Sequence, residues 1–183
     1  MKAKNIFLTA AMIFSFALLN AQIYLGKTCE ISFYSKGPIE DIAAINKSSK
    51  PIFNAANGEV AIKITIKGFE FDKKLMEEHF NEKYMESDKY PYATFGGKVN
   101  EKIDYKKDGT NKVTVTGKLT MHGVEKERTV DGTVTVKGGE IIFDSKFMVA
   151  LKDHKVEIPT LVAQNIAETV EVTVRSTLTE FKK

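Results

Sequence analysis

Apolar and polar residues alternate with a period of two along most of this 183-residue chain. The clearest case is residues 59–67, where Val60, Ile62, Ile64 and Ile66 share one face and mainly Lys, Glu and Thr the other. This alternation predicts a half-buried β-strand, because successive side chains of a strand point to opposite faces. Similar rows predict further strands, about eight in all, at residues 27–34, 69–71, 92–99, 113–121, 130–136, 141–151 and 170–178.

Turn signals separate these rows. They are Asn57-Gly58, residues 106–109, His122-Gly123 and Gly138-Gly139. Short turns without a regular βαβ alternation predict an antiparallel meander, which can close into a barrel or pack as a sandwich. An eight-stranded barrel has room for one ligand, whereas a sandwich of this size fills itself. The periodicity leaves both open.

Three further segments have weaker signals. Residues 39–45 fit a strand or a helix, and residues 158–167 fit a loop or a single helical turn. Gly117 interrupts an otherwise apolar row, which is typical of a bend or of a position beside a ligand.

The alternation stops at residues 73–80, which predict a short amphipathic helix. Asp72 is placed to accept hydrogen bonds from its first free amides. Leu75, Met76, His79 and Phe80 are expected on one side, with charged residues facing water. A helix of about two turns is unstable alone, so we expect it to cover an apolar surface as a cap over a hollow.

Rings and sulphur atoms gather around this helix. They lie within residues 69–95 and comprise Phe69, Phe71, Met76, Phe80, Tyr84, Met85, Tyr90, Tyr92 and Phe95. Each one alone fits ordinary core packing, but together they exceed what a short helix and two strand ends need. They indicate an apolar pocket, with polar groups at its mouth from His79, Asn81, Ser87 and Tyr90.

The first 21 residues have the pattern of a secretory signal peptide. Lys2 and Lys4 precede an apolar run over residues 6–19, and a small residue, Ala21, stands at the expected cleavage site. The run is shorter than the roughly 20 residues that span a bilayer. We therefore expect a signal peptide at residues 1–21, one domain at 22–183, and a periplasmic or secreted protein without a stable membrane span.

Charge and cysteine content exclude some classes of partner. Without Lys2 and Lys4, the chain keeps 25 basic and 24 acidic residues, a net charge of about +1. That balance argues against a nucleic-acid partner, which requires a clustered basic face. Cys29 stands alone, so no intrachain disulfide can form, and we expect it to be buried.

The chain shows no catalytic or metal-binding motif. His79, His122 and His154 are far apart and lack the spacing of a zinc or haem site. No Gly-x-Ser-x-Gly elbow or glycine-rich phosphate loop occurs. We therefore predict no cofactor, no metal and no enzymatic activity, with one alternative left open: an enzyme or metal protein that acts on an amphiphile through these histidines.

Several of these segments together resemble the YceI-like family. The segments are residues 69–71, residues 75–95 with their Tyr-Pro-x-Ala-Thr-Phe run, and residues 118–124 with their Leu-Thr-x-His-Gly-Val run. The resemblance covers nearly the whole mature chain. It implies a lipocalin-like eight-stranded antiparallel β-barrel with a short helical cap, which holds a polyisoprenoid or similar long amphiphile along its axis.

The resemblance also assigns places to residues. It puts Phe71, Leu75, His79 and Phe80 at the cap, Tyr90, Pro91 and Phe95 on the strand that enters the tunnel, and Leu119, His122 and Phe147 on its wall. Thr28-Cys29 stands where family members often carry a His-Ser pair in the opening strand.

The function predicted is an exported lipid carrier or store. Its ligand-binding residues are predicted to be Phe69, Phe71, Leu75, Met76, His79, Phe80, Tyr84, Tyr90, Phe95, Leu119, His122 and Phe147. A filled sandwich that serves as an interaction module is a further alternative, and a homodimer is left open.

Overall fold

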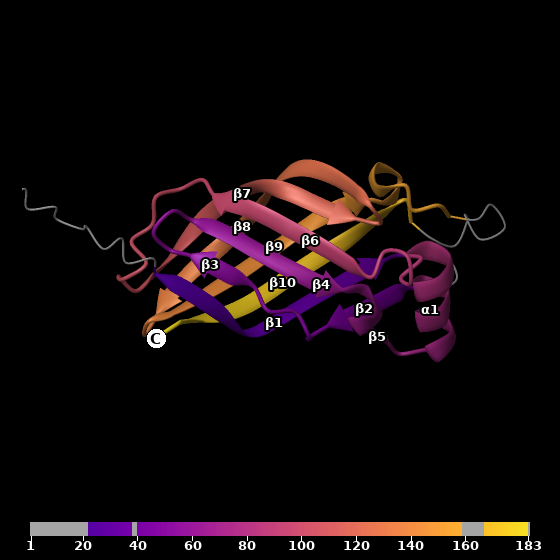
Figure 1. Cartoon of the computed structure of the whole chain (residues 1–183), viewed down its shortest axis with the longest axis horizontal. Helices are drawn as coiled ribbons and strands as arrows, with labels where there is room; N and C mark the ends of the chain where they lie inside the picture. The colour runs from indigo at the N-terminus through magenta and orange to yellow at the C-terminus, as the bar shows by residue number, and fades with distance from the viewer. Residues whose placement is uncertain (1–21, 38–39, 159–166, 183) are drawn as a thin grey trace, which may run out of the picture.

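The computed structural model of the chain describes residues 22–37, 40–158 and 167–182. Within them, ten strands form one antiparallel sheet that curls into an elongated barrel (Figure 1). The strands are β1 (Ile23–Ser35), β2 (Ile42–Asn46), β3 (Ile52–Asn54), β4 (Glu59–Thr65), β5 (Phe69–Phe71), β6 (Tyr92–Val99), β7 (Gly109–Met121), β8 (Val124–Lys137), β9 (Glu140–Ala150) and β10 (Thr169–Glu180). The helical elements are η1 (Ile66–Gly68), α1 (Lys74–His79), a π-helical turn η2 (Phe80–Tyr84) and η3 (Leu151–His154).

The barrel closes because β1 pairs with β10 on one side and with β3 on the other. Eight strands therefore form the ring, in the order β1-β10-β9-β8-β7-β6-β4-β3. The second half of β1 pairs with β2, and β2 pairs with the short β5, which extends the wall at one end. The mainly β, eight-stranded antiparallel barrel with a short helix is confirmed, and the sandwich is wrong.

Two hairpins follow directly from the predicted turn residues. His122 and Gly123, with φ of 51° and 73°, join β7 to β8, and Gly138 and Gly139, with φ of 59° and 82°, join β8 to β9. Positive φ at both central residues is the type I′ geometry that matches the twist of paired strands.

The predicted turn at residues 106–109 is wrong. β6 ends at Val99 and β7 begins at Gly109, so residues 100–108 form a longer loop. Asp104 stabilises a turn inside it, since its carboxylate accepts a hydrogen bond of 3.0 Å from the Lys106 amide. This loop carries Tyr105 into the barrel.

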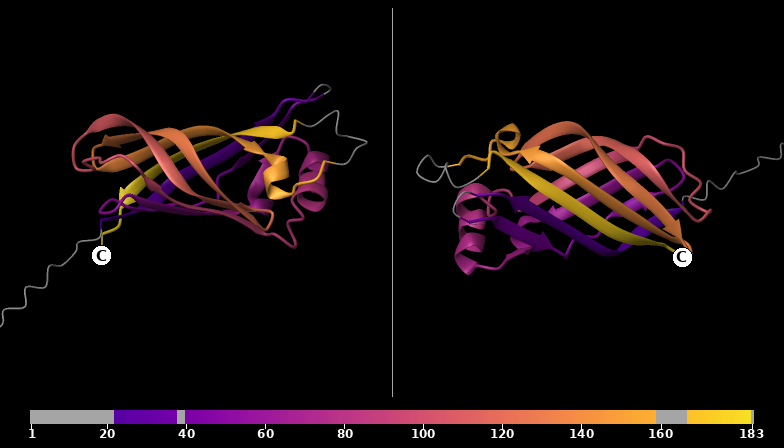
Figure 2. Two further views of the ribbon diagram at one scale, coloured as in Figure 1. Left: turned by 90° about the horizontal axis from the view of Figure 1, so that it is seen from above. Right: turned by 180° about the vertical axis from the view of Figure 1, so that it is seen from behind.

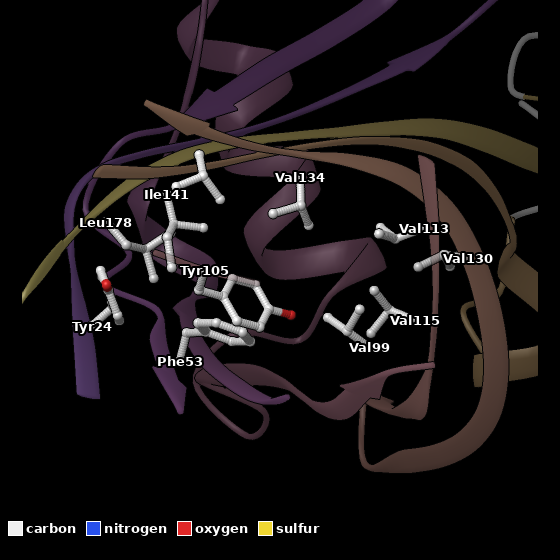
Figure 3. Close-up of a cluster of buried hydrophobic side chains, with 11 residues drawn as sticks. Tyr24, Phe53, Val99, Tyr105, Val113, Val115, Val130, Val134, Ile141 and Leu178 are labelled. Atoms are coloured by element: carbon white, nitrogen blue, oxygen red, sulfur yellow. The ribbon is translucent and has the colours of Figure 1, made fainter. Parts of the chain in front are cut away.

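One end of the barrel is a packed core (Figure 3). Phe53 is fully buried, with its ring centroid 5.0 Å from that of Tyr105 and 5.1 Å from that of Phe143. Aliphatic residues from the other strands complete the cluster, namely Val99, Val113, Val115, Val130, Val134, Val136, Ile141 and Leu178. The C-terminal end of β10 lies at this end, opposite α1 (Figure 1).

The other end carries the helical cap. All of α1, η2 and η3 lie at this end (Figure 2), and the helix at the predicted position is present, from Lys74 to His79. The predicted cap by Asp72 is wrong: Lys73 is the N-cap residue and no side chain caps the helix. The chain continues after His79 into a π-helical turn, so the predicted end at Phe80 is also too early.

Some predictions lie outside the described residues, or partly so. These are the signal peptide at residues 1–21 and most of residues 158–167. Of residues 39–45, which fitted either a strand or a helix, 42–45 belong to β2. Among the described helices, none has the length and apolar character needed to cross a membrane.

Candidate functional site

The half of the barrel next to α1 contains a cavity of about 470 Å³ that is partly open to the surface. Its wall is formed by the inward rows that the alternation predicts. They include Val60, Ile62, Ile64 and Ile66 from the β4 side, Phe143, Ser145, Phe147 and Val149 from β9, and Val170, Val172, Val174 and Ser176 from β10. The cavity is therefore a hollow stretch of the barrel interior with a predominantly apolar wall.

Four aromatic rings close the helix end of this cavity. The ring of Phe80 stacks on Phe33 at a centroid distance of 5.5 Å, and it lies 5.7 Å from Phe69 and 5.0 Å from Phe71. Edge-to-face and offset contacts of this kind stabilise the cluster beyond simple area burial. Phe80 thus anchors the π-helical turn to β1 and β5, and all four rings line the cavity.

Few polar side chains reach the cavity wall, and several of them bond to the protein. The Ser176 hydroxyl donates to the Thr28 carbonyl at 2.9 Å, and the Ser145 hydroxyl donates to the Asp131 carbonyl at 2.6 Å. Glu40, at the helix end, forms an ion pair with Lys73. His79 and Tyr84 line the wall beside the cap. Burial raises the pKa of the Tyr84 hydroxyl above its ordinary value, so that group stays protonated at neutral pH.

Cys29 also faces the cavity. It is buried, and burial raises the pKa of its thiol to about 11, although a hydrogen bond with Ser176 opposes the shift. A thiol with such a pKa is protonated at neutral pH and poorly nucleophilic. The expectation of a buried cysteine is confirmed.

Nine of the twelve predicted site residues line the cavity. They are Phe69, Phe71, Met76, His79, Phe80, Tyr84, Phe95, Leu119 and Phe147. Their role in binding a ligand stays a prediction. The remaining three, Leu75, Tyr90 and His122, lie outside the cavity wall.

Leu75 is on the solvent-facing side of the cap, with 62% of its surface exposed. The half-buried face of the helix centres on Met76 and Phe80, four residues apart. At about 100° per residue, Leu75 points about 100° away from Met76 and about 140° away from Phe80. The prediction that Leu75 lies on the covered face of the helix is wrong.

His122 and Tyr90 connect neighbouring loops and are not part of the cavity wall. Nε2 of His122 lies 2.7 Å from a carboxylate oxygen of Glu86, and Nδ1 lies 3.2 Å from the carbonyl oxygen of His154. The Tyr90 ring meets the imidazole edge at a centroid distance of 4.6 Å. These contacts join the loop after η2 to the β7–β8 turn and to η3.

His154 is fully buried beside His122. Its Nδ1 lies 3.0 Å from the carbonyl oxygen of Val124, and burial lowers its pKa. Among the described residues, no group of three or more His, Cys, Asp or Glu side chains could hold a metal ion. The three histidines of the alternative hypothesis therefore have different surroundings, and His79 is the one on the cavity wall.

Several wall residues are absent from the predicted site. Phe33, with Cys29 and Ile31, belongs to the inward row of β1 and was not singled out as part of the site. The signal was the alternation of the opening strand itself. Gly117 was expected to mark a bend or a ligand. Instead, a Cβ atom there would lie 2.6 Å from the Cα of Gly97 and 2.8 Å from the Phe95 ring, so neighbouring β6 takes that space.

The chain matches a known protein family. A sequence model of the YceI-like domain matches residues 29–178, which is most of the chain. No curated protein sequence matches it.

Solved structures share the fold. A polyisoprenoid-binding domain from Saccharophagus degradans is similar at a TM-score of 0.74 and 16% identity, over 88% of this chain and 99% of that one. Burkholderia cenocepacia BcnA gives a TM-score of 0.69 at 22% identity, over 81% and 95%. A Campylobacter jejuni YceI protein gives 0.54 at 18% identity, over the full length of both chains. At these identities the similarity shows the fold alone.

Proposed function

Because this chain belongs to the YceI-like domain family, we propose that it binds a long amphiphilic lipid, such as a polyisoprenoid, in the cavity of its barrel. The fold relative from Saccharophagus degradans is described as a polyisoprenoid-binding domain, which supports this class of ligand. The apolar chain of the lipid would lie along the barrel axis. Its polar end would lie near polar side chains of the otherwise apolar wall.

The observation that carries the proposal is the cavity itself. A volume of about 470 Å³ falls in the range of about 300–1,000 Å³ that is typical of small-molecule sites. Burial of a methylene contributes roughly 0.8 kcal/mol, so ten buried carbons would contribute on the order of 8 kcal/mol before the cost of association. An alkyl or prenyl chain gains this energy without any catalytic group.

The proposed role is that of a carrier or store rather than an enzyme. The polar groups on the wall include two serines that bond to backbone carbonyls and a protonated thiol. No observation favours the alternative of an enzyme or metal protein. Stoichiometric metal in the purified protein, or turnover abolished by His79→Ala, would favour it.

We further propose that the protein is exported after cleavage near Ala21, on the basis of the basic and apolar pattern of residues 1–21. The mass of the protein recovered from its native host tests this. We expect the mass of a chain that begins at Gln22. A mature protein that retains Met1 to Ala21 would contradict export by this route.

Native mass spectrometry after mild purification tests the binding function. We expect an added mass that is removed by organic extraction and that corresponds to a long amphiphile. The extracted protein should regain a ligand when incubated with a polyprenol, a quinone or a fatty amide. A protein that is always ligand-free and takes up none of these would refute the proposal.

A further inference from the structure

The barrel wall has a seam between β8 and β9. Their ladder runs from Lys137 and Glu140 to Gly132 and Ser145. Beyond that point both strands continue toward the helix end, and the structure shows no further backbone pairing between them. We call this stretch, residues 124–131 of β8 and 146–150 of β9, the seam. The turn η3 packs beside it, where His154 meets the carbonyl of Val124.

Arg128 occupies the seam from the inward face of β8. It shares that face with the buried residues Val130 and Val134, and it lies opposite Gly117 of β7. Its guanidinium carbon is 5.4 Å from the centroid of the Phe147 ring. Because Phe147 lines the cavity, the guanidinium lies next to one side chain of the cavity wall.

The guanidinium has unused hydrogen-bond donors. Its Nε and Nη1 atoms are buried and have no partner among the described residues. No carboxylate of residues 22–37, 40–158 or 167–182 forms an ion pair with it. Burial lowers the pKa of Arg128, and the charge of Asp153 opposes this shift without reaching contact. Buried guanidinium donors without an acceptor are unfavourable for folding alone.

The second arginine of the chain shows the ordinary arrangement. Arg175 is exposed on β10, and its Nε donates to the Asp144 carboxylate at 2.6 Å. The two arginines thus differ in both exposure and pairing. Arg128 has the features of a receptor for an anion, whereas Arg175 has those of a surface ion pair.

We propose that Arg128 binds the anionic head group, a carboxylate or a phosphate, of the amphiphile whose chain fills the cavity. This inference rests on the proposed function and names the class of its ligand. The planar fork of the guanidinium matches the paired oxygens of either group. A turn of the Phe147 ring brings the buried donors to the cavity, with the head group in the seam and the chain along the apolar wall.

The surface beside the seam carries charges of both signs. Lys126 on β8, and Lys152 and Lys155 at η3, are exposed cations, and the same stretches carry the exposed acidic residues Glu125, Glu127, Asp153 and Glu157. Direct contact is assigned to Arg128 alone.

Three probes with one chain and different head groups test the proposal. They are farnesol, farnesoic acid and farnesyl phosphate, each titrated into the extracted full-length protein at pH 7.5 by calorimetry. We expect the phosphate, the carboxylate or both to bind at least tenfold more tightly than the alcohol. The anion that shows the preference identifies the head group.

Two variants of Arg128 and one control at Arg175 separate the role of Arg128 from general effects. Arg128→Met should bind farnesol as the parent does and lose the anion preference, and the matched control Arg175→Met should keep it. Arg128→Lys retains the charge but not the fork, so it should keep part of the preference. It serves as the readout if Arg128→Met fails to fold.

The outcomes distinguish the role of Arg128 from the lipid-binding function on which it rests. Equal binding of the three probes by the parent, or an anion preference that survives in Arg128→Met, overturns the role of Arg128 and leaves the lipid-binding function standing. If none of the three probes binds, and neither does a longer neutral prenol, both are overturned.

Discussion

The two ends of the barrel are built from the same inward rows of apolar residues, but one end is filled and the other is hollow. At the filled end Phe53, Val134, Ile141 and Leu178 have no exposed surface. At the hollow end large side chains such as Ile62, Ile64 and Phe80 remain only partly buried. The strand pattern alone therefore does not decide whether a barrel has a cavity.

The difference comes from what enters each end. At the filled end, the loop of residues 100–108 inserts Tyr105 among the rings of Phe53 and its neighbours. At the other end, α1 and η2 lie across the opening and contribute Phe80 to the rim. A side chain inserted along the axis fills the interior, whereas a helix laid over the opening covers part of it and leaves the space beneath.

Truncation of a ring at the filled end should give the largest loss of stability. For Phe53→Ala we expect a loss of about 3–5 kcal/mol in the free energy of unfolding, because the ring is fully buried and its neighbours cannot collapse into the gap. Urea denaturation monitored by circular dichroism measures it. A loss below about 1 kcal/mol would mean that this end is loosely packed too.

The same substitution at the rim of the cavity should act differently. Phe80→Ala should cost less, about 1–3 kcal/mol, since the ring is half-buried and contacts three other rings. It should release bound lipid several-fold faster, as followed by native mass spectrometry after dilution. If Phe80→Ala destabilises the protein as much as Phe53→Ala and leaves retention unchanged, Phe80 is ordinary core and the cap is not a lid.

Tyr105 adds a dependence on pH to the filled end. Burial raises the pKa of its hydroxyl to about 12, above the value of about 10 of an unfolded tyrosine. The unfolded chain therefore loses this proton first as the pH rises, and the folded state loses about 1–2 kcal/mol between pH 10 and 12. Below pH 10 the contribution is constant.

Tyr105→Phe isolates that effect. The buried hydroxyl has no hydrogen-bond partner among the described residues, so its removal should leave stability at pH 7 unchanged or raise it by about 1 kcal/mol. Denaturation curves at pH 8, 10 and 11 should show a smaller decline for the variant than for the parent. Equal declines in both proteins would show that Tyr105 does not titrate with folding.

The smallest effect is expected at Leu75, on the outer side of the cap. Leu75→Ser should change stability by less than about 0.5 kcal/mol and leave lipid retention unaltered, because the side chain is exposed. Met76→Ser, one position along, is the matched control, and it should weaken retention. A loss of retention in Leu75→Ser would show that the outer face of α1 also meets the ligand.

Local pattern was enough to locate most of the strands and most of the candidate wall. The rows that begin at Val60 and Val113 lie on the inward face as predicted, because the two-residue period of a strand is fixed by the backbone. The resemblance to the YceI-like family placed the aromatic cap correctly in its main features. Errors occurred where packing decides, as with Leu75, Asp72 and the turn at residues 106–109.

The sequence by itself determined which side chains share a face and which residue pairs can take the positive φ of the two tight hairpins, since both are properties of a few neighbouring residues. Only the tertiary structure decided that β1 meets β10, that Tyr105 fills one end, and that the Arg128 guanidinium lies over Phe147 with no partner among the described residues. These features depend on contacts between segments far apart in the chain. Their energies depend on which groups exclude water together, and no local pattern encodes that.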